Sequence, residues 1–172
     1  MWDDAAAFLA ALDRLSPTLL HRDANRTNLF SRRHPGRPDE TVAVDWAFVG
    51  SGAVGEEVVQ VVFSTLMRGL APPEAAQELS AVAWQGYLQG LREADWQGDE
   101  RRARLGYAAS AVLRWGLFPG WVLQMATDAQ RRTQRESRLG RPAEEIVASL
   151  GAATRLLLAL AAEARALIAA LD

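Results

Sequence analysis

Apolar residues recur at helical spacing over most of this chain. Near the start, Phe8, Leu9, Leu12 and Leu15 are predicted to form one apolar stripe on a helix over 3–15. From Glu56 onward the same spacing continues almost without interruption. It predicts helices over 56–70, from about 71 to 92, from 99 to 138 with a kink or break at 117–120, and over 142–171. Large aromatic residues on these helices, Trp84, Trp115 and Trp121, are predicted to lie in the core.

A different pattern separates the first helix from the others. Segments 28–33 and 41–46 are rich in strand-forming residues, and the Pro- and Gly-containing stretch between them is typical of a turn. They predict one small β-hairpin, preceded by a short extended segment at 18–22 and followed by a Gly-rich loop at 49–55. The predicted fold class is therefore mainly α with a small β-hairpin. We expect one domain over 1–172, with residues 16–55 forming its loop and hairpin part and residues 56–172 its helical subdomain.

Composition limits the classes of partner. Lys and Arg number 19 against 21 Asp and Glu, so a net charge of −2 gives no electrostatic reason to expect binding to nucleic acid or an anionic membrane. The chain has no Cys, which excludes thiolate metal sites and disulfides and suits a cytoplasmic protein. The first residues carry acids where a signal peptide needs positive charge, and the apolar stretch 156–162 is too short to span a bilayer.

The stretch "HRDANRTN", residues 21–28, carries the candidate chemistry. Phosphoryl transfer needs a carboxylate that accepts the proton of the attacking hydroxyl, and oxygen ligands that hold Mg²⁺ against the phosphates. Asp23 is the candidate for the first task. Asn28, five residues later, and Asp45, at the end of the apolar strand "TVAV", are the candidates for the second. A hairpin between them would bring Asn28 and Asp45 together.

In these motifs, residues 16–70 resemble the aminoglycoside phosphotransferase family, a branch of the protein-kinase-like fold. The matching features are "HRDANRTN", the strand "VAVDW", and "GSGAVGEEVV", a Gly-rich turn that leads into a helix with an acid near its start. The resemblance implies an O-phosphotransferase that uses ATP or another NTP with Mg²⁺ and acts on a small-molecule hydroxyl acceptor. It also implies that His21 and Glu57 are structural, with Glu57 bracing the catalytic loop, and that residues 71–172 complete a helical C-terminal lobe.

Three further residues stand close to the motif residues in the sequence. Arg22 stands where most members of that family have Gly, and we expect its side chain to be solvated or paired with an acid. Asn25 would orient Asp23 or shape the turn, and Trp46 would wall the cleft. All three are candidates for contact with nucleotide or substrate. The glycines of 50–55 also read G-x-G-x-x-G, but a turn after Asp45 accounts for them better than a phosphate loop.

Charged residues of the helices leave two further alternatives. The basic run 128–138 is interpreted as a solvated helix face, with phosphate binding as the alternative. A cationic substrate would find candidate carboxylates after the hairpin, at Glu56, Asp95, Asp99 and Asp128.

The chain also lacks expected parts. Kinases of this type have an N-terminal β-rich lobe with a phosphate-covering loop and a Lys–Glu pair. Only one predicted helix precedes residue 16, and the chain contains no Lys. We therefore expect a C-terminal lobe alone, covered by a missing N-terminal lobe or by self-association through the exposed face. The alternative hypothesis is a non-catalytic helical binding or interaction module. The presence of Asp23, Asn28 and Asp45 together argues against it, because such a module would not need all three residues.

Overall fold

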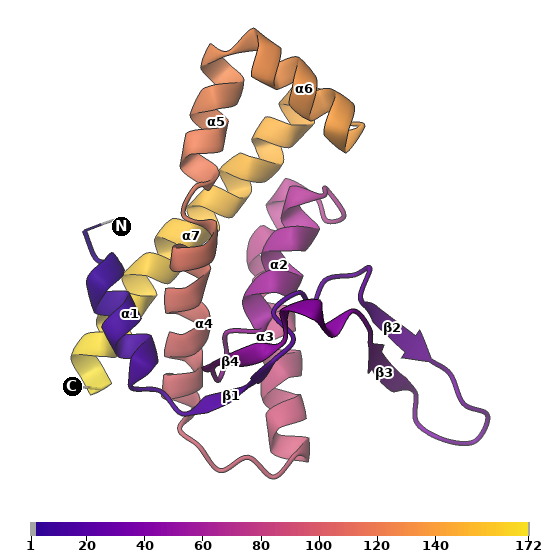
Figure 1. The fold of residues 1–172 in the computed structure, drawn as a ribbon, viewed down its shortest axis with the longest axis vertical. Coiled ribbons are helices and arrows are strands. Elements are labelled where there is room, and N and C mark those ends of the chain that lie inside the picture. The colour runs from indigo at the N-terminus through magenta and orange to yellow at the C-terminus, as the bar shows by residue number, and fades with distance from the viewer. Residues whose placement is uncertain (1–2, 172) are drawn as a thin grey trace.

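The fold is mainly helical, with two short pairs of antiparallel strands (Figure 1). The computed structural model describes residues 3–171. In chain order the regular elements are α1 (Ala5–Asp13), β1 (Pro17–Leu20), β2 (Leu29–Arg32), β3 (Glu40–Ala43), η1 (Trp46–Phe48), β4 (Gly50–Ala53), α2 (Val58–Met67), η2 (Pro73–Ala75), α3 (Ala76–Glu93), α4 (Glu100–Trp115), α5 (Phe118–Thr127), α6 (Ala129–Leu139) and α7 (Ala143–Leu171). The mainly α fold class is thus confirmed.

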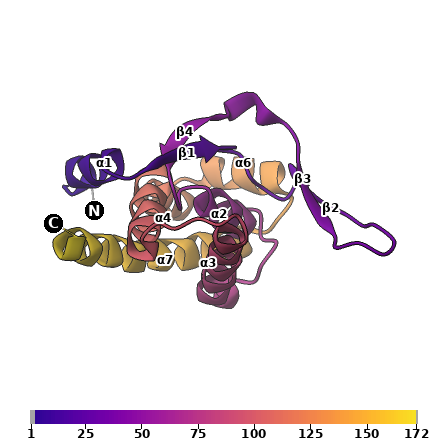
Figure 2. The same ribbon diagram turned by 90° about the horizontal axis from the view of Figure 1, so that it is seen from below.

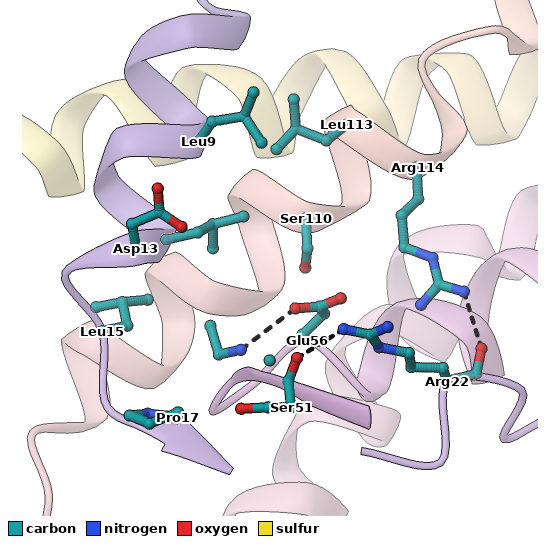
Figure 3. Close-up of a pocket in the computed structure, with 13 residues that line it drawn as sticks. Leu9, Asp13, Leu15, Pro17, Arg22, Ser51, Glu56, Ser110, Leu113 and Arg114 are labelled. Atoms are coloured by element: carbon teal, nitrogen blue, oxygen red, sulfur yellow. Dashed lines mark hydrogen bonds between the residues drawn. The ribbon is translucent and has the colours of Figure 1, made fainter. Parts of the chain in front are cut away.

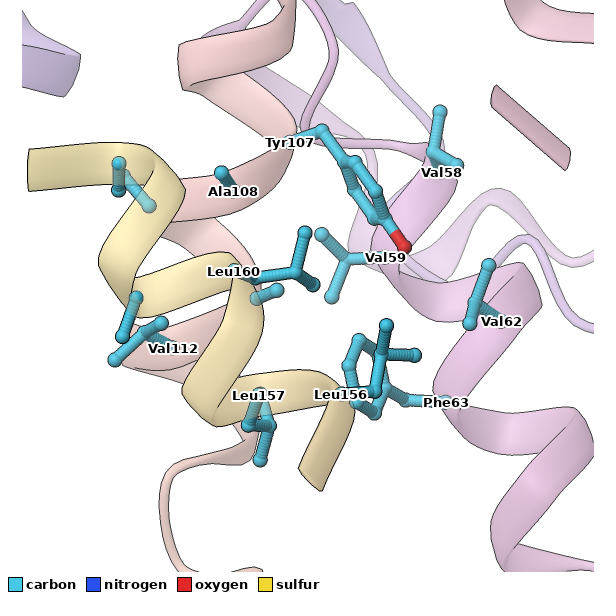
Figure 4. Packing of buried hydrophobic residues seen from close by; sticks show 14 of the residues in the cluster. Val58, Val59, Val62, Phe63, Tyr107, Ala108, Val112, Leu156, Leu157 and Leu160 are labelled. Carbon is cyan, nitrogen blue, oxygen red and sulfur yellow. The ribbon is translucent and has the colours of Figure 1, made fainter. Parts of the chain in front are cut away.

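The long helix α7 organises the core. It crosses the molecule, and α4, α5 and α2 pack along it (Figure 1). Leu156, Leu157 and Leu160 of α7 meet Phe63 of α2 and Tyr107 of α4 in a buried cluster (Figure 4). By length and composition α7 could cross a membrane, although the apolar stretch 156–162 alone is too short to do so. Half of the most apolar window of α7 is buried inside the protein. Its composition is therefore that of a core helix.

The predicted hairpin is confirmed, in shorter form. Strands β2 and β3 pair antiparallel from Leu29 opposite Ala43 to Arg32 opposite Glu40. The pair projects away from the helices in both views (Figures 1 and 2).

The prediction of a Gly-rich loop at 49–55 was wrong for its central residues. Residues 50–53 form β4, which pairs antiparallel with β1 from Pro17 opposite Ala53 to Leu20 opposite Gly50. Backbone pairing needs no particular side chain, so a strand with two glycines forms where a partner strand is supplied. A Cβ on Gly52 would lie 2.3 Å from the Leu20 side chain, so the small residue also permits the close approach of β1.

The predicted helix 99–138 is three helices. The chain breaks after Trp115, and Pro119 lies in the first turn of α5, where its missing N–H is not needed. A second break falls at Asp128, whose side chain accepts a hydrogen bond from Arg131 N at 3.0 Å and caps α6. Asp99 caps α4 in the same way through Arg101 N. These two acids, considered for a cationic substrate, therefore have structural partners.

The packing of α4 against the turn before α2 depends on two glycines. A Cβ on Gly106 of α4 would lie 2.0 Å from Val54 O, and one on Gly55 would lie 1.9 Å from Ala103 O. Gly55 also has a φ of +96°, which side chains disfavour. The Tyr87 hydroxyl accepts a hydrogen bond from Gly55 N at 2.9 Å, and burial raises the pKa of that hydroxyl. This contact sets the position of the turn that leads to Glu57.

Candidate active site

The loop that carries Asp23 has an unusual backbone at the preceding residue. Arg22 has a φ of +64°, in the left-handed region that a non-glycine residue adopts only at a cost. This conformation agrees with the Gly that the resembled family usually has here. Such strain persists only where surrounding contacts hold the backbone in place.

Hydrogen bonds from both sides hold the Arg22 backbone. The Glu57 carboxylate accepts from His21 N at 2.6 Å and from Arg22 N at 3.0 Å. From the other side, Arg114 Nη2 donates to Arg22 O at 2.8 Å (Figure 3). A charged acceptor and a charged donor thus hold the two peptide groups that flank the Arg22 Cα, and such bonds are stronger than those between neutral groups. Glu57 has the bracing position that the family resemblance implied.

The Arg22 side chain is exposed, which fits the solvated alternative and not the acid-paired one. Its exposed guanidinium donates from Nη2 to Ser51 O of β4 at 2.6 Å (Figure 3). It ties the loop to the β1–β4 pair instead of meeting a carboxylate. Arg22 also lines a pocket of about 460 Å³ between α1, β4 and α4, together with Arg114, Glu56 and Asp13. The Glu56 carboxylate there accepts from Ala53 N at 3.3 Å.

Removing the brace should destabilise the protein measurably. We expect Glu57→Ala to lower the free energy of unfolding by about 2 kcal/mol, because two loop N–H groups lose a charged acceptor. Urea denaturation followed by circular dichroism measures the change. Glu144→Ala, at an exposed site in the first turn of α7, is the control and should change stability by less than about 0.5 kcal/mol. Equal effects of the two substitutions would show that Glu57 does not brace the loop.

Three side-chain amides converge on the Asp23 carboxylate. Asn25 Nδ2 and Gln60 Nε2 each donate to Oδ1 at 2.9 Å, and Asn28 Nδ2 donates to Oδ2 at 2.9 Å. A carboxylate offers roughly four lone-pair sites, so this arrangement leaves one on Oδ2 for a further donor. Asn25 also accepts from Thr27 N at 2.8 Å, so it serves both the carboxylate and the turn.

Gln60 is the site residue that the sequence analysis missed. It lies three positions after Glu57 on α2, and that spacing places both side chains on the same face of a helix. Because Glu57 was expected to contact the loop, the three-residue spacing could have indicated that Gln60 also reaches it. Arg114 was missed as well, and its position 92 residues away in the sequence left no local signal.

His21 is a structural residue in this geometry, as the resemblance implied. Its Nδ1 accepts from Asp23 N at 3.2 Å, so the ring proton lies on Nε2, which donates to Val44 O at 2.8 Å. The ring also lies 4.6 Å from that of Trp46, centroid to centroid. His21 therefore links the loop that carries Asp23 to the end of β3.

Asn28 and Asp45 lie at the same end of the hairpin. Val44 N donates to Asn28 O at 2.9 Å, and this bond continues the β2–β3 pairing by one residue. Asp45 directly follows Val44, so its backbone lies close to that of Asn28. Asp45 is exposed, has a φ of +60°, and within residues 3–171 its carboxylate has no hydrogen-bond or ion-pair partner. No group of three or more His, Cys, Asp or Glu residues in the same range is placed to hold a metal. The Asp45 carboxylate and the Asn28 amide oxygen are a smaller donor set of another kind, and hard oxygen donors suit Mg²⁺.

A pocket of about 530 Å³ adjoins this loop between the hairpin, α2 and α3. Its lining is mostly apolar and includes Trp46, which was expected to wall a cleft, with Leu19, Val58 and Val61. Trp46 Nε1 donates to Ala43 O at 3.1 Å, which orients the ring.

Comparison with known proteins returns no match. No family model, no curated protein and no solved structure is significantly similar to this chain. The resemblance to aminoglycoside phosphotransferases therefore rests on the motif residues alone, and the function drawn from it is a proposal.

Proposed function

We propose that this chain is the acceptor- and metal-binding lobe of an O-phosphotransferase that uses Mg²⁺ and ATP or another NTP. The observation that carries the proposal is the Asp23 carboxylate, which three amides hold in one orientation with one lone-pair site left. A base fixed in this way needs no reorganisation when the acceptor hydroxyl arrives.

In this proposal Asp23 accepts the proton as the acceptor oxygen bonds to the γ-phosphorus and the bond to the leaving phosphate breaks. Asn28, through its amide oxygen, and Asp45 would hold Mg²⁺, which neutralises charge on the phosphates. Glu57 and Arg114 keep the loop in its strained conformation. The role of the protein is to position the reactants and stabilise charge.

Apolar side chains on the strand side support the proposal that another lobe or a second copy covers this face. Leu19 is 72% exposed and Phe48 is 64% exposed, and Phe30, Val44 and Val49 of the strand region 17–53 are exposed as well. Contact between large apolar side chains and water is unfavourable, so a partner that covers these side chains would be stabilising. A covering β-rich lobe would also supply the phosphate-contacting Lys that this chain lacks. A cytoplasmic location stays a prediction.

The metal role of Asp45 is the part of the proposal to test first. We expect the chain to bind Mg–ATP in calorimetry and Asp45→Asn to weaken that binding at least about tenfold, because one charge-assisted ligand is lost. Binding of ATP in the presence of EDTA should be the same for both proteins.

Asp39→Asn is the matched control, since Asp39 is an exposed acid on the hairpin loop away from the motif. If Asp45→Asn and Asp39→Asn bind Mg–ATP equally, Asp45 is not a metal ligand. If the unsubstituted chain shows no binding that depends on Mg²⁺, the alternative of a non-catalytic helical module gains the support.

A further inference from the structure

A third pocket lies away from the loop that carries Asp23. It is lined by residues of α5, α6 and the N-terminal part of α7, where α5 and α6 form a corner (Figure 1). Its volume is about 540 Å³, within the range of small-molecule sites. Met67, Trp115, Trp121 and Ile146 form apolar walls, and α6 supplies the other wall.

The face of α6 that lines this pocket is cationic. Arg131, Gln134, Arg135 and Arg138 have the 3–1–3 spacing of one helix face, and all four line the pocket. A helix on a protein surface ordinarily turns an apolar face inward. Here none of the α6 residues is buried, and the pocket-facing side is polar. The basic run 128–138 was interpreted from the sequence as a solvated helix face. Three of its arginines, Arg131, Arg135 and Arg138, instead line a pocket.

The pocket contains uncompensated positive charge. None of its lining residues is acidic. Arg131 pairs with Asp128 at 3.2 Å, but among the residues that the structure describes neither Arg135 nor Arg138 has a carboxylate partner. The Arg135 guanidinium instead lies 4.7 Å from the Trp121 ring centre. Burial lowers the pKa of Arg135, and repulsion from Arg138 and Arg131 lowers it further.

Trp115, another residue that lines the pocket, has an indole N–H without a hydrogen-bond partner. The Nε1 atom of this indole is buried. The ring is held by Phe118, with centroids 5.0 Å apart, and by Phe63 at 6.2 Å. A buried N–H without an acceptor costs free energy, so the packing around this ring carries a cost beside the pocket.

We propose that this pocket binds a small amphipathic anion. Its carboxylate or phosphate group meets Arg135 and Arg138, and its apolar body lies against Met67 and Trp121. The inference rests on the pocket alone and stands whether or not the chain transfers phosphate.

The test compares a charged probe with an uncharged one of the same shape. We use 4-phenylbutyrate and its amide, with calorimetry for affinity and ¹H–¹⁵N spectra for location. The six Trp residues give six indole signals, and Trp115→Phe assigns the one that matters. We expect the carboxylate to bind at least about tenfold more tightly than the amide and to shift the Trp115 indole signal.

Arginine variants separate this pocket from other apolar surfaces. Arg135→Gln and Arg138→Gln should each weaken 4-phenylbutyrate binding about tenfold, whereas Arg155→Gln, exposed on α7, should leave it unchanged. Arg138 is itself exposed, so its variant keeps the fold if Arg135→Gln does not. Equal affinity for acid and amide, equal binding by all three variants, or shifts confined to the pocket beside Trp46 would each overturn the proposal.

Discussion

Asp23→Asn is expected to slow phosphoryl transfer from Mg–ATP by about 10³-fold, because the substitution removes the proton acceptor. The fold should survive. Asn keeps an oxygen for the amides of Asn25 and Gln60. Only the bond from Asn28 Nδ2 to the side chain is lost, and Asn28 Nδ2 keeps the backbone carbonyl of residue 23 as an acceptor at 3.0 Å. The loss of one such bond costs about 1 kcal/mol of stability. Release of ADP, with water or a panel of small alcohols as acceptors, measures the rate.

Two controls accompany this measurement. Asp39→Asn removes an acid from the hairpin loop and should leave the rate unchanged. Gln60→Ala removes one of the amides that orient Asp23 and should lower the rate about tenfold with little change in nucleotide affinity. If Asp23→Asn releases ADP at the rate of the unsubstituted protein, Asp23 is not the base and the proposed function fails.

Gly106→Ala is expected to lower the free energy of unfolding by about 3 kcal/mol. The added Cβ would lie 2.0 Å from Val54 O, a distance that no rotamer change can relieve because backbone atoms form the contact. Either α4 or the turn before α2 must move. That turn leads into Glu57, so the displacement should also weaken the brace on the catalytic loop. Urea denaturation measures the loss of stability.

A glycine elsewhere provides a matched comparison. Gly90 also lies in a helix, and a Cβ there would meet no atom within 4 Å. Gly90→Ala should therefore raise the free energy of unfolding by about 0.5–1 kcal/mol, since alanine restricts the unfolded chain and favours the helix. Opposite signs for the two substitutions would separate the close contact from helix propensity. A gain for Gly106→Ala would contradict the packing described for α4.

The helices and the hairpin were largely predictable because their signals are local. The spacing of Val58, Val62 and Leu66 indicates a buried helix face by itself, and the turn between β2 and β3 contains Pro and Gly. Helix ends were harder, because Asp128 ends α5 and caps α6 with no Pro or Gly between the two helices to mark the break. The β1–β4 pair was missed, since a strand of Gly, Ser and Ala shows no alternation until its partner is known.

Local order in the sequence determined the candidate chemistry. The spacing of His21, Asp23 and Asn28, with Asp45 after a strand, identified the residues without any coordinates. Only the tertiary structure decided how they are held. Gln60 and Arg114 reach the loop from α2 and α4, 37 and 92 residues from their partners. Such contacts depend on how helices pack, and hydrophobic burial selects that packing over the whole chain, so no short stretch of sequence records it.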